Sequence, residues 1–171
     1  INSLSGTSPL MNVKNHIING SFLIWQRGTS ILIDSSAKVG TADRWVMKSP
    51  GGDARRKAHT HGNISFGNSR YYLEIDTTTE AFTQDPELSQ RIEDVRTLEG
   101  KTVTLSYWVK VSDNSEDVYI DIKYKQNFGT GTDPETLISA SSEYASSLIA
   151  EVKLPSGWTK KTHTFNIASI S

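Results

Sequence analysis

The sequence predicts an all-β protein, a sandwich of two antiparallel sheets with little helix. Three observations predict it. Two long segments carry an apolar residue at every second position, several shorter segments repeat that alternation, and turn-forming residues separate them at intervals of roughly 8–12 positions. Alternation of period two places the apolar side chains on one face of a strand. About eight such strands with short turns are typical of a β-sandwich.

The clearest strands are residues 101–111, KTVTLSYWVKV, and residues 118–128, VYIDIKYKQNF. The first alternates apolar with mainly polar positions throughout, and the second alternates apolar with polar positions over its first seven residues. The segment between them, SDNSED, has the composition of a turn. We therefore expect the two strands to form a hairpin or to lie as near neighbours. The inward side chains expected in the core include Leu105, Tyr107, Val109, Ile120, Ile122 and Phe165.

Shorter strands are expected at DRWVMKS (43–49), RYYLEID (70–76), ELSQRIEDV (87–95) and WTKKTHTFNI (158–167). The stretch NGSFLIWQRGTS (19–30) predicts a first strand, since the Asn19-Gly20 turn precedes four apolar residues and Gly28 ends them. Trp25 and Trp45 are expected in the core.

The segment SSEYASSLIAEVKL (141–154) allows two interpretations. Its apolar residues fit helical spacing, which would give a short helix. Its Ser content and the following Pro155-Ser156-Gly157 favour a loop followed by a strand over residues 149–154.

Composition bounds the domain organisation and the possible partners. The first 15 residues are polar and aperiodic, which predicts a linker from an upstream region, and residues 16–171 form the predicted β-sandwich domain. The net charge of -1 gives no argument for binding nucleic acid. No apolar run is long enough to insert in a membrane, no signal-peptide pattern begins the chain, and no cysteine is present.

No motif predicts catalysis, a cofactor or a metal site. Glu93 and Asp94 are adjacent, and neighbours on a strand point to opposite faces, so they cannot act as the facing carboxylates of a glycosidase. His59 and His61 share a strand face but lack nearby carboxylates. The basic segment ARRKAHTH (54–61) is either a solvated face or an anion contact. The expected protein is therefore not an enzyme.

The outward positions suggest a shallow sugar-binding face. A pyranose presents an apolar C–H face to an aromatic ring and hydroxyls to polar side chains. Alternation places such groups outward on three of the expected strands, namely Trp108, Tyr119 and Tyr72 with Glu74, Asp121, Lys110 and Lys123. The alternative is that a loop or a neighbouring subunit covers Trp108.

Five segments in order resemble a family of carbohydrate-binding-like jelly-roll domains of bacteriophage tail fibres and tail appendages. They are IINGSFLIWQRGTS (17–30), TADRWVM (41–47), SQRIEDVRTLEGKTVTLSYWVKV (89–111), QNFGTG (126–131) and GWTKKTHTFNI (157–167). The resemblance implies a jelly-roll sandwich displayed on a virion. It also implies other tail proteins as partners, and the fibre setting makes a homotrimer the expected oligomer.

Two functions follow as expectations from that resemblance. The first is attachment to a host-surface glycan or receptor, and the alternative is a purely structural role in subunit packing. Members of that family continue past the FNI strand, so the resemblance implies that the sandwich lacks C-terminal strands or continues beyond Ser171. Related sugar-binding modules often hold calcium with an acidic residue where this chain has Leu23, which argues against such a site here.

Overall fold

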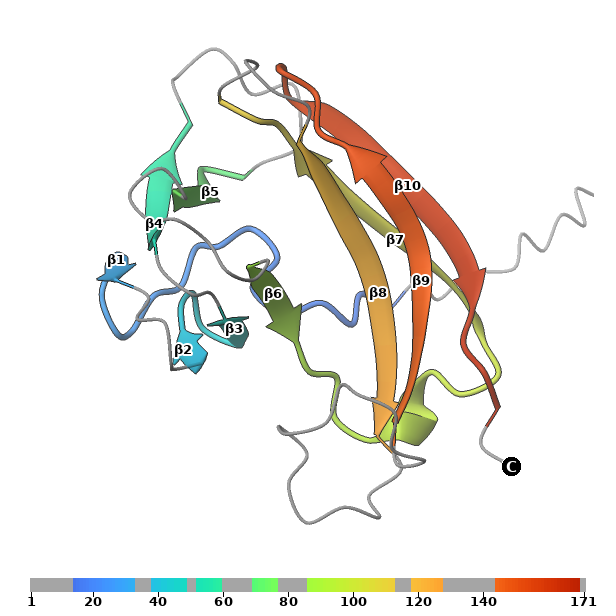
Figure 1. The fold of residues 1–171 in the computed structure, drawn as a ribbon. Helices are drawn as coiled ribbons and strands as arrows, with labels where there is room; N and C mark the ends of the chain where they lie inside the picture. The colour runs from blue at the N-terminus through green and yellow to red at the C-terminus, as the bar shows by residue number, and fades with distance from the viewer. Residues whose placement is uncertain are drawn as a thin grey trace, which may run out of the picture. The chain divides into compact units, whose positions relative to one another are not determined.

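The computed structural model describes residues 14–32, 38–48, 52–59, 69–76, 86–112, 118–127 and 144–169. Within them the secondary structure is almost entirely strand, and every strand pairing is antiparallel, which confirms the all-β prediction (Figure 1). Chain contacts divide the protein into two units. The first unit comprises residues 1–63 and 69–91, and the second comprises residues 64–68 and 92–171.

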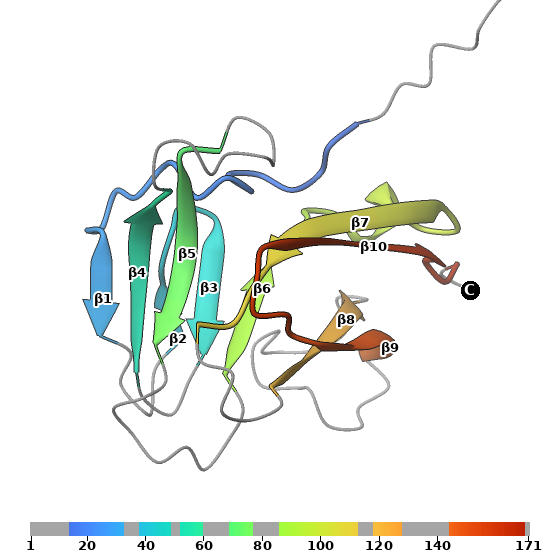
Figure 2. The same cartoon turned by 90° about the horizontal axis from the view of Figure 1, so that it is seen from above.

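The first unit contains two three-stranded sheets. One has the order β1-β4-β5 and the other the order β2-β3-β6 (Figure 2). The strands are β1 (Ser30–Leu32), β2 (Lys38–Gly40), β3 (Trp45–Lys48), β4 (Asp53–Ala58), β5 (Tyr71–Asp76) and β6 (Glu87–Gln90). Met47 and Ala54 are fully buried, and Leu73 and Leu88 pack against them. These four residues come from both sheets, so the core of this unit lies between the sheets.

The segment from Asn19 to Gly28 is not a strand, so that prediction is wrong. The Asn19 side chain hydrogen-bonds backbone groups that pairing with another strand would require. Its Oδ1 accepts from the amides of Leu23 at 2.9 Å and Ile24 at 3.1 Å. Its Nδ2 donates to the Ile24 carbonyl at 2.9 Å. Asn19 and Phe22 both have positive φ, 54° and 52°, which turns the chain twice. Asn adopts this conformation more readily than most residues because its short amide bonds locally.

The same turn binds the next segment of the chain. Asn19 Nδ2 also donates to the Asp43 carbonyl at 3.0 Å, and the Asp43 amide donates to the Ile24 carbonyl at 2.9 Å. The indole of Trp45 donates to the Asn19 carbonyl at 3.1 Å, and its ring lies 5.2 Å from that of Phe22. Trp25 is buried, as expected of a core residue, whereas Trp45 is half-buried. Residues 19–25 and 43–45 therefore form one hydrogen-bonded structure, here called the Asn19 turn.

The second unit contains two ribbons of paired strands. They are β7 (Thr102–Val109) with β10 (Thr159–Asn166), and β8 (Tyr119–Asn127) with β9 (Tyr144–Lys153). β7 and β8 are the two strands expected to form a hairpin or to lie as near neighbours. The hairpin is wrong, because β7 pairs along its whole length with β10 and β8 pairs with β9, in separate two-stranded sheets. The expected strand over residues 149–154 is confirmed and begins earlier, at Tyr144, so the helical alternative does not hold.

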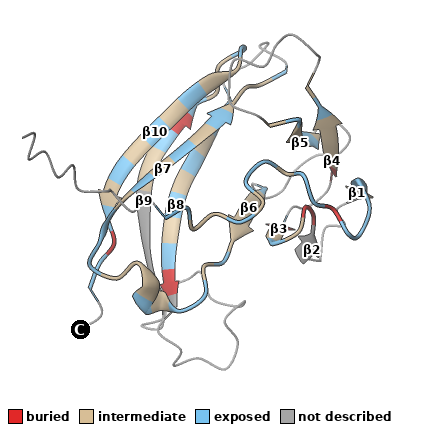
Figure 3. Cartoon of the chain, turned by 180° about the vertical axis from the view of Figure 1, so that it is seen from behind, coloured by how far each residue is buried: buried red, intermediate tan, exposed pale blue. Residues whose placement is uncertain are grey.

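The two ribbons form two layers with their inner faces together (Figure 2). The rings of Tyr124 on β8 and Phe165 on β10 stack at 5.6 Å across the layers. Exposed and half-buried residues alternate along β7 and β10 and over most of β8, as Figure 3 shows, which confirms the predicted faces. The six residues expected in the core point inward but are half-buried, since each layer is only a ribbon wide in the described residues. Val152 and Ile167 are buried.

Asn19→Ala is expected to lower the free energy of unfolding by about 2–4 kcal/mol. The change removes four hydrogen bonds, each worth about 0.5–1.5 kcal/mol net, and puts alanine in a left-handed conformation. Urea denaturation measures the effect. Asn15→Ala, which removes one acceptor bond to the Ile17 amide, is the matched control and should change stability little. Equal effects of the two variants would contradict the central role of Asn19.

Met47→Ala should cost about 3–5 kcal/mol, because Met47 is fully buried between the sheets of the first unit. Leu105→Ala should cost less, about 1–2 kcal/mol, because Leu105 is only half-buried. Thermal unfolding of the two variants ranks them. The reverse order would contradict the placement of the core.

Candidate functional site

The seven residues predicted to bind a glycan do not share one sheet. Tyr72 and Glu74 lie on β5 in the first unit, Trp108 on β7 with Lys110 just after it, and Tyr119, Asp121 and Lys123 on β8. Because the inner faces of the two ribbons meet, Trp108 and Tyr119 lie on opposite outer faces of the second unit. Both are exposed, Trp108 by 37% and Tyr119 by 50%, so each points outward as predicted. The seven residues therefore lie on three different sheets, which contain β4 and β5, β7 and β10, and β8 and β9.

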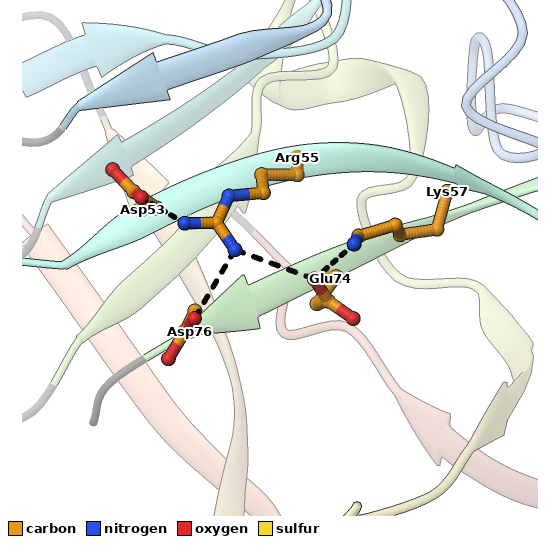
Figure 4. Close-up of polar contacts among 5 residues, drawn as sticks. All are labelled: Asp53, Arg55, Lys57, Glu74 and Asp76. Carbon is orange, nitrogen blue, oxygen red and sulfur yellow. Dashed lines mark hydrogen bonds and ion pairs between the residues drawn. The ribbon is translucent and has the colours of Figure 1, made fainter. Parts of the chain in front are cut away.

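The β4–β5 face carries a network of ion pairs around Arg55 (Figure 4). Arg55 Nη1 lies 3.2 Å from Asp76 and 3.9 Å from Glu74, and its Nη2 donates to Asp53. Lys57 Nζ lies 3.3 Å from the same Glu74 carboxylate. Asp53 faces Asp76 directly across the ladder, a pairing that like charges destabilise. The Asp53 hydrogen bond raises the pKa of the Arg55 guanidinium, so the cation that separates these carboxylates keeps its charge.

The basic segment from Ala54 to His61 is therefore mostly engaged within the protein. Arg56 lies 4.5 Å from the centroid of the Tyr71 ring and donates to the Leu23 carbonyl. On the opposite face, Tyr72 packs its ring 4.9 Å from that of His59, and burial raises the pKa of Tyr72. His61 lies outside the described residues. The contacts of Glu74, Arg55 and Lys57 serve to hold β4 to β5.

The outer face of β8 and β9 is charged and exposed. Asp121 and Lys123 form an ion pair at 2.9 Å, with about half of each side chain exposed (49% and 47%). Exposed pairs of this kind contribute little to stability. Tyr119 stands opposite Lys153, and a register shift follows Ile122. The structure thus places three predicted residues together here, with Tyr119 as the one aromatic ring at an outward position of β8.

The outer face of β7 and β10 is a ladder of short polar side chains. Thr102 Oγ1 donates to Asn166 Oδ1 at 2.6 Å, and the hydroxyls of Thr104 and Thr164 lie 3.0 Å apart. The register continues the ladder with Ser106 opposite Thr162 and Trp108 opposite Lys160. All eight residues are exposed. Of these eight residues only Trp108 is a predicted site residue, although the alternation of THT in residues 162–164 places both threonines outward.

The remaining chemical candidates have structural contacts. Glu93 and Asp94 lie in the turn before the 3-10 helix η1 (Val95–Thr97), where Asp94 accepts from the Arg96 amide at 3.0 Å. That backbone hydrogen bond, with the Arg96 side chain, lowers the pKa of Asp94. Among the described residues, no three His, Cys, Asp or Glu side chains are arranged to hold a metal ion. No helix in the described part of the chain is long and apolar enough to cross a membrane.

A scan against protein-family models found no match for the chain, and searches of the curated proteins and of the solved structures found none either.

Arg55→Met should lower the melting temperature at pH 7, because Asp53 and Asp76 would face each other without the cation between them. The loss should shrink in about 1 M NaCl, because salt screens the repulsion between the two carboxylates. Lys123→Met, which breaks the exposed pair with Asp121, is the control and should have little effect at either salt concentration. A loss for Arg55→Met that is independent of salt would contradict the electrostatic role.

Proposed function

We propose that this chain is a non-catalytic module of a virion tail appendage, and that it binds a host-surface glycan or receptor through the outer face of β7 and β10. The observation that carries the proposal is the exposed Trp108 ring at one end of a hydroxyl ladder. An indole offers the flat apolar surface on which the C–H face of a pyranose stacks. The hydroxyls of Ser106 and Thr162 stand next to it and can donate to or accept from sugar hydroxyls.

The other two faces fit a glycan less well. On the β4–β5 face the planar charged groups already bond one another, so a sugar would have to displace ion pairs. On the β8–β9 face Tyr119 stands opposite a lysine and two positions from an ion pair, with charged groups in place of hydroxyls. The β7–β10 face combines an aromatic ring with uncharged polar groups, which is the combination that sugar recognition requires.

The resemblance to phage tail domains supports the setting rather than the ligand. Two of the resembling segments, residues 17–30 and 41–47, meet in the Asn19 turn. The residues of these segments hydrogen-bond one another within the fold, so the resemblance in them concerns the structure of the domain and not a binding site. We therefore also propose that the chain is located in a virion tail, that other tail proteins are its partners and that it forms a homotrimer.

A structural role in subunit packing is the second candidate, and one observation favours it. Ile18, just before the Asn19 turn, and Leu23 and Ile24 within it expose 50%, 51% and 50% of their surface. Two side chains hold this segment in place. Asn19 Oδ1 accepts from the amides of Leu23 and Ile24, and Gln90 exchanges two hydrogen bonds with the backbone of Ile18. A fixed segment with three exposed aliphatic side chains suits packing against another subunit.

Trp108→Ala should reduce binding to host cells or to a bacterial glycan array by at least about fivefold, the loss expected for one aromatic stacking contact. The melting temperature should change little, since the ring is partly exposed. Tyr119→Ala is the matched control, because it removes an exposed ring from the opposite face and should leave binding intact.

Trp108→Phe keeps an aromatic surface and should therefore retain part of the binding. This variant separates the loss of the stacking contact from a change in the fold. A large loss of stability in Trp108→Ala with no ligand bound by the unaltered protein would favour the structural role.

A further inference from the structure

Two tryptophans and two lysines gather at one end of the β7–β10 ribbon. Trp108 and Lys160 are direct partners in the ladder, and Val109 pairs with Thr159 as the last pair. The alternation continued by one residue places Lys110 opposite Trp158 on the same outer face. Lys110 Nζ lies 5.5 Å from the centroid of the Trp158 ring, which is the contact expected of such neighbours. These four residues are called the Trp–Lys cluster.

We propose that the Trp–Lys cluster binds an acidic sugar residue, a pyranose that carries a carboxylate or a phosphate. This inference rests on the proposed function and names the class of glycan that the site accepts.

The charge of this face is the first support. The outward positions of β7 and β10 carry one cation, Lys160, and no carboxylate. Lys110 adds a second cation at the end of the ribbon. Among the described residues, no ion pair involves Lys110 or Lys160, whereas Arg55, Lys57 and Lys123 each have a carboxylate within 4 Å. An anion arriving at the cluster would therefore form new pairs without breaking any.

The arrangement of the four side chains is the second support. Cross-strand neighbours in an antiparallel ladder stand about 5 Å apart, and alternate residues along a strand about 6.8 Å apart. Each tryptophan thus has one lysine across the ladder and one along its own strand. A sugar ring stacked on the Trp108 indole brings an equatorial acidic substituent within reach of an ammonium group. The Trp158 ring also holds the Lys110 ammonium at the surface.

The adjoining ladder extends the site beyond one residue. Ser106 and Thr162 follow Trp108 and Lys160 directly, and Thr104 and Thr164 come next. Their hydroxyls suit the neutral neighbours of an acidic residue in an oligosaccharide. Nucleic acid is a poor fit, because two lysines on a chain of net charge -1 supply few phosphate contacts.

The test uses the full chain on an array of bacterial glycans that includes uronate-, sialate- and phosphate-bearing members and neutral ones. The strongest binders should be acidic glycans. Comparison of the uronate- and sialate-bearing glycans with the phosphate-bearing ones shows whether the acidic group is a carboxylate or a phosphate. The strongest binder is then compared with its carboxyl-reduced or dephosphorylated form, which should bind about tenfold more weakly. Lys160→Gln and Lys110→Gln should each weaken binding of the acidic form by about threefold to tenfold and leave the neutral form unchanged.

Lys123→Gln is the matched control, since it removes the same charge from the opposite outer face. Neutral strongest binders, or lysine variants that bind like the unaltered protein while Trp108→Ala does not, would overturn the acidic-sugar inference and leave the proposed function standing. Binding of no glycan would overturn the inference, and the absence of binding to host cells as well would overturn the proposed function. Equal losses in Lys123→Gln and Lys160→Gln would indicate unspecific charge attraction and also overturn the inference.

Discussion

The carboxamide of Asn19 is the group on which the first unit depends. It bonds the backbone on both sides of a double turn and reaches across to Asp43, so that residues 19–25 and 43–45 become one structure. β3 starts at Trp45, within this structure, and two residues later Met47 enters the core. A hydrogen-bonded side chain near the start of the described chain thus sets where the first buried strand begins. No aliphatic residue could replace it, because the amides of Leu23 and Ile24 would lose the oxygen that accepts their hydrogen bonds.

In the second unit a single constraint produces both the core and the proposed site. Alternation along β7 and β10 turns Tyr107 and Phe165 inward, and it turns Thr104, Trp108 and Lys160 outward. Slipping the register by one residue would exchange the two sets. The outward set therefore needs no special loop to hold it, since the inward set fixes it. A site built in this way is flat, exposed and held by the sheet, which suits a ligand that lies along the strands.

Strand positions could be predicted from the sequence, because period-two alternation is a local property of the chain. Strand partners could not: β7 pairs with β10 across roughly fifty intervening residues, and nothing in the SDNSED turn excludes the hairpin. The strand expected at residues 19–28 does not form, because the Asn19 carboxamide hydrogen-bonds backbone groups that strand pairing would use. The apolar residues of this segment give no sign of that competition. The wrong strand pairing also made part of the predicted site wrong. Trp108 was placed outward, but Tyr72 and Tyr119 were assigned to its face, while Lys160 and Trp158 were missed.

The faces of this protein differ less in their number of polar groups than in whether those groups are already paired. Around Arg55, every charge described has an opposite charge close by, and a ligand would have to exchange one ion pair for another at little gain. On the β7–β10 face the hydroxyls bond across the ladder in two of three rows, and the two lysines have no carboxylate beside them among the described residues. Binding free energy is available where a group gains a partner that the fold does not provide. For this reason the Trp–Lys cluster is a better candidate site than the more heavily charged β4–β5 face, and an acidic sugar is proposed as its ligand in place of a neutral one.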